Sequence, residues 1–162
     1  MAVTDDILAT YRAPRAVIAR LLAGEQHEAR ALAYLLAAVI VAHIAQWPAM
    51  SRAAFLQPEV PLTQRMIAAL LAVLAAIPFF YLVAALSRLI LRAFGGQGSF
   101  FSARIVLFWA FLATTPLMLI QGLVSAFVGS GSAVTATGLV VFAVFIWFWV
   151  AGLRVSEFGR SP

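Results

Sequence analysis

The sequence predicts an all-α membrane protein with four transmembrane helices and one amphipathic helix before them. Three observations lead to this prediction. Of the 162 residues, 64% are hydrophobic and only 10% are charged, whereas a soluble domain carries about 25% charged residues. Four long apolar runs contain no Asp, Glu, Lys or Arg, and most arginines lie on one side of these runs. A water-soluble fold of this length has too little interior to hide so much apolar surface, so lipid is the expected solvent.

The segment before the first run, residues 4–24, is predicted to be an amphipathic cytoplasmic helix. Thr4 is a suitable N-cap, and Asp5 and Asp6 suit the positive end of a helix dipole. Pro14 is expected to begin a second short helix.

The same segment is amphipathic. One face gathers the apolar side chains of Ile7, Tyr11, Val17, Ile18, Leu21 and Leu22, and the opposite arc carries Arg12, Arg15 and Arg20. Such a helix either lies in the membrane interface or packs on the cytoplasmic ends of the bundle, and the two interpretations are compatible. No cleaved signal peptide is expected, because this segment lacks a secretory apolar core.

The four apolar runs are predicted to be membrane spans within a single membrane domain, residues 1–162. They cover residues 31–47, 66–87, 105–128 and 133–153. Crossing a hydrocarbon core about 30 Å thick takes roughly 20 helical residues, so the short first run is expected to use its flanks. The expected connections are an irregular segment from Pro48 to Arg65, a glycine-rich turn with Gly95, Gly96 and Gly98, and a short turn at Gly129–Ser132.

Arginine counting orients the spans. One side carries Arg12, Arg15, Arg20, Arg30, Arg88, Arg92, Arg104, Arg154 and Arg160, whereas the other side carries Arg52 and Arg65. Because positive charge is retained on the cytoplasmic side, both termini are predicted to be cytoplasmic and the protein is placed in a bacterial inner membrane. This use of arginine also accounts for the basic pI of about 11.1, so nucleic-acid binding is not expected.

Residues that carry catalysis or bind metals are scarce. There is no cysteine, and only two histidines occur. His27 lies between Glu25 and Glu28 on what is expected to be a solvated face, because one helix does not bring all three side chains together. No enzyme activity, no metal and no cofactor is predicted. A second group, His43, Gln46 and Trp47, is expected near the external interface, where amphipathic side chains reach water.

The polar residues at membrane depth are all uncharged. The candidates for helix packing are Pro78, Thr114, Thr115, Pro116, Gln121, Gly122 and Ser125. Prolines kink helices, threonine hydroxyls satisfy the disturbed backbone, and glutamine bridges neighbouring helices. All six acids lie outside the apolar runs, which argues against ion-coupled transport. A passive pore, or a small-molecule pocket among these residues, remains an alternative.

The glycine turn Phe94–Phe101, which reads FGGQGSFF, the mid-span Pro116 and the segment beginning Pro14-Arg15-Ala16 together resemble the bacterial branch of the YIP-domain family of Ypt/Rab-interacting proteins. The resemblance covers about residues 11–155. It implies an α-helical membrane domain with a cytoplasmic N-terminus and no catalytic residues. Eukaryotic members act with small GTPases in vesicle trafficking, but nothing in this chain indicates a GTPase-binding surface. The family is usually described with five spans, and either a shorter subgroup or the N-terminal helix would account for the four counted here.

These observations favour a non-enzymatic membrane protein that acts through helix packing. It is predicted to be an accessory, assembly or membrane-organising subunit whose partners are the lipid bilayer and other membrane protein subunits. The alternative is a small-solute channel or carrier with a pocket near Pro78 and Pro116.

Overall fold

The computed structural model describes residues 3–159, and this part of the chain is helical without any strand. Arg160, one of the arginines counted above, lies outside the described residues. The six helices are α1 (Val3–Arg12), α2 (Pro14–Ala23), α3 (Glu28–Leu56), α4 (Leu62–Ala93), α5 (Phe100–Val128) and α6 (Ser132–Phe158). The last four are each long and apolar enough to cross a membrane. The predicted all-α fold with four membrane-spanning helices is therefore confirmed.

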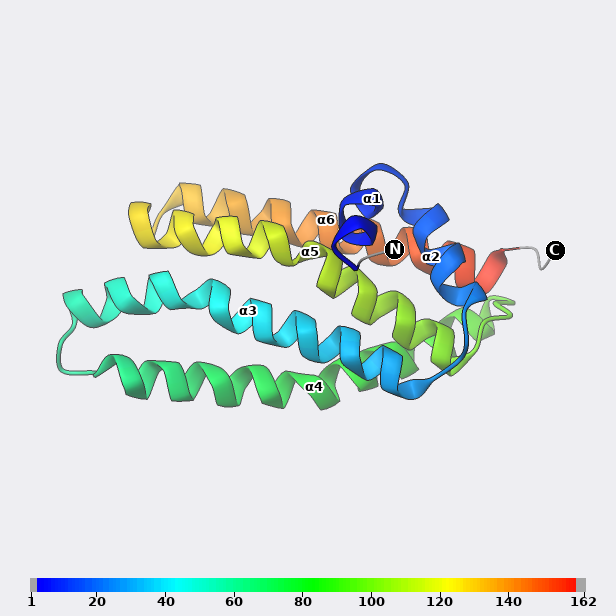
Figure 1. Ribbon diagram of the computed structural model, residues 1–162, viewed down its shortest axis with the longest axis horizontal. Helices are drawn as coiled ribbons and strands as arrows, with labels where there is room; N and C mark the ends of the chain where they lie inside the picture. The colour runs from blue at the N-terminus through cyan, green and yellow to red at the C-terminus, as the bar shows by residue number, and fades with distance from the viewer. Residues whose placement is uncertain (1–2, 160–162) are drawn as a thin grey trace.

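The four long helices run lengthwise through the molecule as two antiparallel pairs, α3 with α4 and α5 with α6 (Figure 1). The pairs join mainly where α3 packs along α5. One end of the bundle, here called the glycine-turn end, holds the turn between α4 and α5, the start of α3 and the end of α6. At the other end, here called the open end, the two pairs diverge (Figure 1).

The N-terminal segment forms two helices that break at Pro14, as the sequence predicts. Pro14 begins α2, where its missing N–H costs nothing because the first helical N–H groups have no partner within the helix. An ion pair between Arg20 and Asp6 holds α2 to α1. The apolar face packs on the bundle, mainly on α6, and its buried side chains are Val17, Ile18 and Leu21. This face is therefore covered by protein.

Hydrogen bonds fix α1 against the middle of α5. The indole Nε1 of Trp109 donates to the Thr10 hydroxyl at 3.1 Å, which itself donates to the Asp6 carbonyl at 2.7 Å. The Tyr11 hydroxyl donates to the Ala113 carbonyl at 2.9 Å. Burial raises the pKa of Tyr11 above its usual 10.0, so the phenol keeps the proton that it donates. The segment before the spans is thus packed against the bundle as part of the fold.

The connection between α3 and α4 is shorter than expected. The predicted irregular segment from Pro48 to Arg65 is wrong in extent, because α3 continues through Pro48 to Leu56 and only residues 57–61 are non-helical. A proline removes one donor from the helical ladder, and long membrane helices tolerate this when the neighbouring turns keep their bonds. The chain reverses instead where Pro58 and Pro61 lie close together. By contrast, the glycine turn and the short turn after Val128 lie where the sequence predicts them.

The hydrophobic core lies in the glycine-turn half of the bundle. The buried residues of α5 extend from Phe101 to Thr115, and no residue of α5 beyond Thr115 is buried. Leu35 of α3 and Phe148 of α6 pack against this stretch. By contrast, α4 buries only Ala84. The open half is therefore held together by much less packing than the glycine-turn half.

Candidate functional site

The glycine turn closes around one carboxylate, that of Glu157 near the end of α6. The side chain of Glu157 is 0% exposed, and its Oε2 lies 3.2 Å from Nη1 of Arg88. Oε2 also accepts a hydrogen bond from the N–H of Gly98 at 3.0 Å, and the Glu157 carbonyl accepts from the N–H of Gln97 at 2.9 Å. Arg88 donates in addition to the Gly96 carbonyl at 3.4 Å. These contacts tie α4, the turn and α6 together.

The same carboxylate explains why glycine occupies two positions of the turn. A Cβ atom at Gly96 would lie 2.5 Å from Oε2 of Glu157, and one at Gly98 would collide with Oε1. The third glycine, Gly95, has φ of +84°, a conformation that side chains other than hydrogen disfavour. The turn predicted from Gly95, Gly96 and Gly98 is thus shaped by a residue far away in the sequence. Oε1 of Glu157 is buried and has no hydrogen-bond partner within residues 3–159.

The sequence predicts no role for Glu157 and places it only among the six acids outside the apolar runs. One signal was present. Glu157 is the only acid after Glu59, and it follows a span that ends on the side richest in arginine. A single carboxylate among several arginines is a natural ion-pair candidate, but hydropathy alone does not identify its partner.

The two threonine hydroxyls in the middle of α5 donate hydrogen bonds within their own helix. The Thr114 hydroxyl donates to the Ala110 carbonyl and the Thr115 hydroxyl donates to the Leu112 carbonyl, each at 2.8 Å. The Leu112 carbonyl is the one that Pro116 leaves without its usual helical donor. Both threonines are buried, so neither offers its hydroxyl to a solute.

Gly122 lies at a close approach of α5 to α3. A Cβ atom at this position would collide with the carbonyl oxygen of Ala45 and would lie 2.9 Å from its carbonyl carbon. Close backbone contact through small residues is how membrane helices gain van der Waals packing. Gly122 therefore acts as a crossing point between the two helix pairs.

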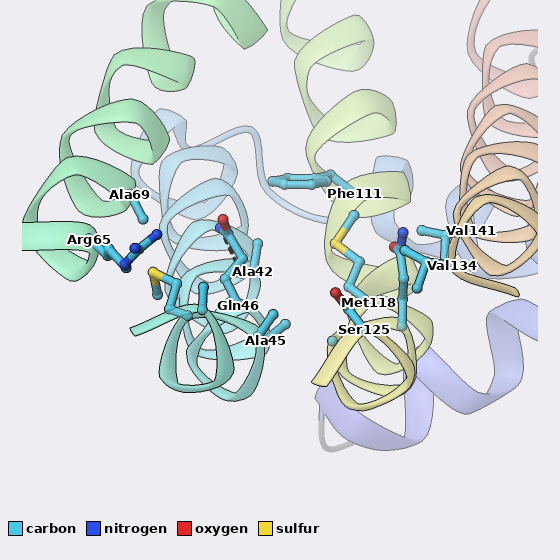
Figure 2. A pocket seen from close by; sticks show the side chains of 15 residues that line it. Ala42, Ala45, Gln46, Arg65, Ala69, Phe111, Met118, Ser125, Val134 and Val141 are labelled. Carbon is cyan, nitrogen blue, oxygen red and sulfur yellow. Dashed lines mark hydrogen bonds between the residues drawn. The ribbon is translucent and has the colours of Figure 1, made fainter. Parts of the chain in front are cut away.

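A crevice of about 740 Å³ opens between the helix pairs in the open half. Its walls are mostly apolar, with alanine the most frequent residue, and Figure 2 shows side chains from both pairs facing it. The polar lining residues are Gln46, Arg65, Gln121 and Ser125. The crevice thus brings Gln121 and Ser125 of the predicted midspan group together with Gln46 of the predicted interface group. Neither Pro78 nor Pro116 lines it.

The other interface candidates lie outside this crevice. The His43 ring meets the Trp47 ring edge-on, with centroids 5.9 Å apart, and Trp47 is 42% exposed. Nδ1 of His43 is buried and has no hydrogen-bond partner in the described part of the chain. Only Gln46 of the three is therefore placed to meet a ligand in the crevice.

The residues with metal-binding chemistry do not gather. His27 contacts Glu25 at 2.9 Å on the surface, while Glu28 pairs with Arg104. Within residues 3–159, no group of three His, Asp or Glu side chains is arranged to hold a metal ion.

Comparison with known proteins gives one family match. The chain matches the Yip1 domain over residues 8–160, a range that begins within α1 and includes α2 and all four long helices. No curated protein matches, and no solved structure matches. Since the match covers nearly the whole chain, the protein belongs to the Yip1 domain family.

Proposed function

We propose that this chain is a non-enzymatic integral membrane protein, an accessory, assembly or membrane-organising subunit that packs against other membrane proteins and lipid. The observation that carries this proposal is the uneven packing of the spans. The core occupies the glycine-turn half, whereas α4 buries only Ala84. Ala68 and Ala72, one turn apart on α4, are exposed and leave room for a close neighbour. Small residues on an outward face favour helix association in lipid.

In this proposal the glycine-turn end faces the cytoplasm of a bacterial cell. That end carries Arg30, Arg88, Arg92, Arg104 and Arg154, and the open end carries Arg52 and Arg65. The asymmetry agrees with retention of positive charge on the cytoplasmic side. The crevice then opens toward the outer face of the membrane.

A small-solute channel or carrier remains the second candidate, and the crevice is the observation in its favour. A continuous path is harder to support, because the Phe80 and Phe111 rings stack with centroids 4.5 Å apart, and Phe111 lines the crevice on the side of the core. We therefore rank packing above conduction.

Purification of the full-length protein from native membranes in mild detergent tests the proposal. We expect a protein partner to co-purify in fixed stoichiometry. Replacing Ala72 by Phe on the exposed face of α4 is expected to lower its recovery, whereas the matched change Ala136→Phe on the exposed surface of α6 is expected to leave it unchanged. Recovery of the free chain alone, or equal recovery with both variants, would count against packing through α4.

A further inference from the structure

We propose that the crevice binds an anionic phospholipid, with the headgroup at Arg65 and one acyl chain reaching toward Phe111. The inference deepens the proposed function, because it assigns a lipid to the half of the bundle that the chain's own side chains leave unfilled. Three layers of different chemistry follow one another along the crevice, and they match the three parts of a phospholipid.

The outer layer is cationic. Nε of Arg65 donates to the Val60 carbonyl at 3.2 Å, and Nη2 donates to the carbonyl and side-chain oxygen of Gln57 at 3.2 and 3.3 Å. Nη1 has no hydrogen-bond partner and the guanidinium no carboxylate partner within residues 3–159. The Arg65 guanidinium is thus held in place at the mouth of the crevice, and the described residues leave its Nη1 free to donate. A planar guanidinium suits a phosphate, because it can donate two parallel hydrogen bonds.

The depth of Arg65 fits a lipid headgroup. Arg65 and Arg88 lie on the same helix about 35 Å apart, at 1.5 Å per residue. This separation slightly exceeds a hydrocarbon core about 30 Å thick. If Arg88 lies at the cytoplasmic boundary, Arg65 lies at the opposite headgroup layer.

The middle layer carries amide groups from both helix pairs. Gln46 lies on α3 and Gln121 on α5, and both line the crevice. Nε2 of Gln46 reaches only its own helix, at the Ala42 carbonyl 3.3 Å away, and the Gln121 amide makes no side-chain hydrogen bond to residues 3–159. An amide without a partner is costly in an apolar medium. The ester oxygens of a phospholipid lie just below its phosphate and can accept from these amides.

The inner layer is apolar. A smaller cavity of about 180 Å³ shares Phe111, Met118 and Val141 with the crevice and continues it to Phe80 and Phe145. The helix from Arg65 to Phe80 rises about 22 Å, which exceeds the roughly 15 Å depth of one hydrocarbon leaflet. An acyl chain therefore finds an apolar channel of sufficient length.

The charge at Arg65 favours an anionic lipid over a helix from another protein. A helix would leave the Arg65 guanidinium without an acidic partner unless it carried one at the matching depth, whereas the phosphate of an anionic lipid supplies the negative charge at the headgroup layer. A second copy of this chain, or a partner helix, is therefore an outcome that the experiment must separate from lipid.

Lipid retention by the full-length protein tests the inference. The purified protein is mixed with vesicles of equal parts phosphatidylglycerol and phosphatidylcholine, extracted again in mild detergent, and weighed by native mass spectrometry. We expect about one phosphatidylglycerol per chain and little phosphatidylcholine. Arg65→Gln is expected to lower phosphatidylglycerol retention about fivefold, the effect of losing about one arginine's attraction for an anionic lipid.

Two matched pairs control for charge and for folding. Arg52 lies at the same end and donates to the Ala126 and Phe127 carbonyls, but it does not line the crevice, so Arg52→Gln should retain lipid like the wild type. Ala69 lines the crevice and Ala72 does not. Ala69→Leu is therefore expected to displace the lipid, and Ala72→Leu is not.

The inference is overturned by equal retention of both lipids, by wild-type retention in Arg65→Gln, or by the same loss with Arg52→Gln as with Arg65→Gln. Displacement of lipid by a co-purified protein helix or a second copy at the crevice would also refute it. The proposed packing function is tested separately, by the recovery of a protein partner with Ala72→Phe. A negative result for lipid retention would therefore refute lipid binding and leave the packing function standing.

Discussion

Replacing Arg88 by Met is expected to lower the free energy of unfolding by about 3–5 kcal/mol. The reason is that the Glu157 carboxylate is 0% exposed and would remain buried without its cationic partner. One backbone N–H, that of Gly98, would still reach Oε2, but a single hydrogen bond does not replace the lost charge. Unfolding of the purified protein in detergent, followed by circular dichroism against temperature or denaturant, measures this effect.

Two controls separate loss of the ion pair from loss of packing. Arg92→Met removes an exposed arginine one turn further along α4 and should change stability by no more than about 0.5 kcal/mol. The double variant Arg88→Met with Glu157→Leu removes both charges and should recover most of the loss, because an apolar pair can replace a buried ion pair. If Arg88→Met proves no more harmful than Arg92→Met, then Glu157 is not held by Arg88 as described.

Replacing Gly122 by Val is expected to destabilise the protein by about 3 kcal/mol, because side-chain atoms would collide with the backbone of Ala45. The helices α3 and α5 would have to separate, and their contact joins the two helix pairs. The same unfolding measurement detects the change. A second readout is the yield of a disulfide between one cysteine introduced on α3 and one on α5, which should fall when the helices separate. The chain has no cysteine of its own, so no other disulfide can form within it.

The matched control for Gly122 is Gly138 on α6. An added Cβ atom there would meet only the side-chain amide of Gln121, at 2.8 Å, and this amide can rotate away. Gly138→Ala should therefore be neutral or slightly stabilising, since alanine is about 1 kcal/mol more favourable than glycine in a helix interior. Comparable losses for Gly122→Ala and Gly138→Ala would show that the crossing point is not tightly packed.

The parts of the fold that depend on local sequence were predictable. The uncharged runs predict the four long helices, Pro14 at a helix start predicts the break between α1 and α2, and the glycines predict the turn after α4. In each case the signal lies within a few residues of the feature that it determines, because helix formation and lipid exposure are local properties of the chain.

The missed features depend on residues far apart in the sequence. The Glu157 carboxylate meets Gly98 across 59 positions, and nothing near either residue indicates the other. Pro48 looks like the end of a helix, yet α3, a helix of 29 residues, passes through it, as membrane-spanning helices can when neighbouring groups satisfy the disturbed backbone. The crevice arises because the two helix pairs diverge, and the placement of helix pairs is not encoded in any single span.

The most direct test of the packing function is photo-cross-linking in native membranes from a probe at Ala68 on the exposed face of α4. The account predicts a discrete adduct to another membrane protein, while the same probe at the buried Ala113 of α5 gives only cross-links within the chain. If Ala68 yields lipid adducts alone in its native membrane, α4 has no protein neighbour, and the proposal of a subunit that packs against other membrane proteins is contradicted.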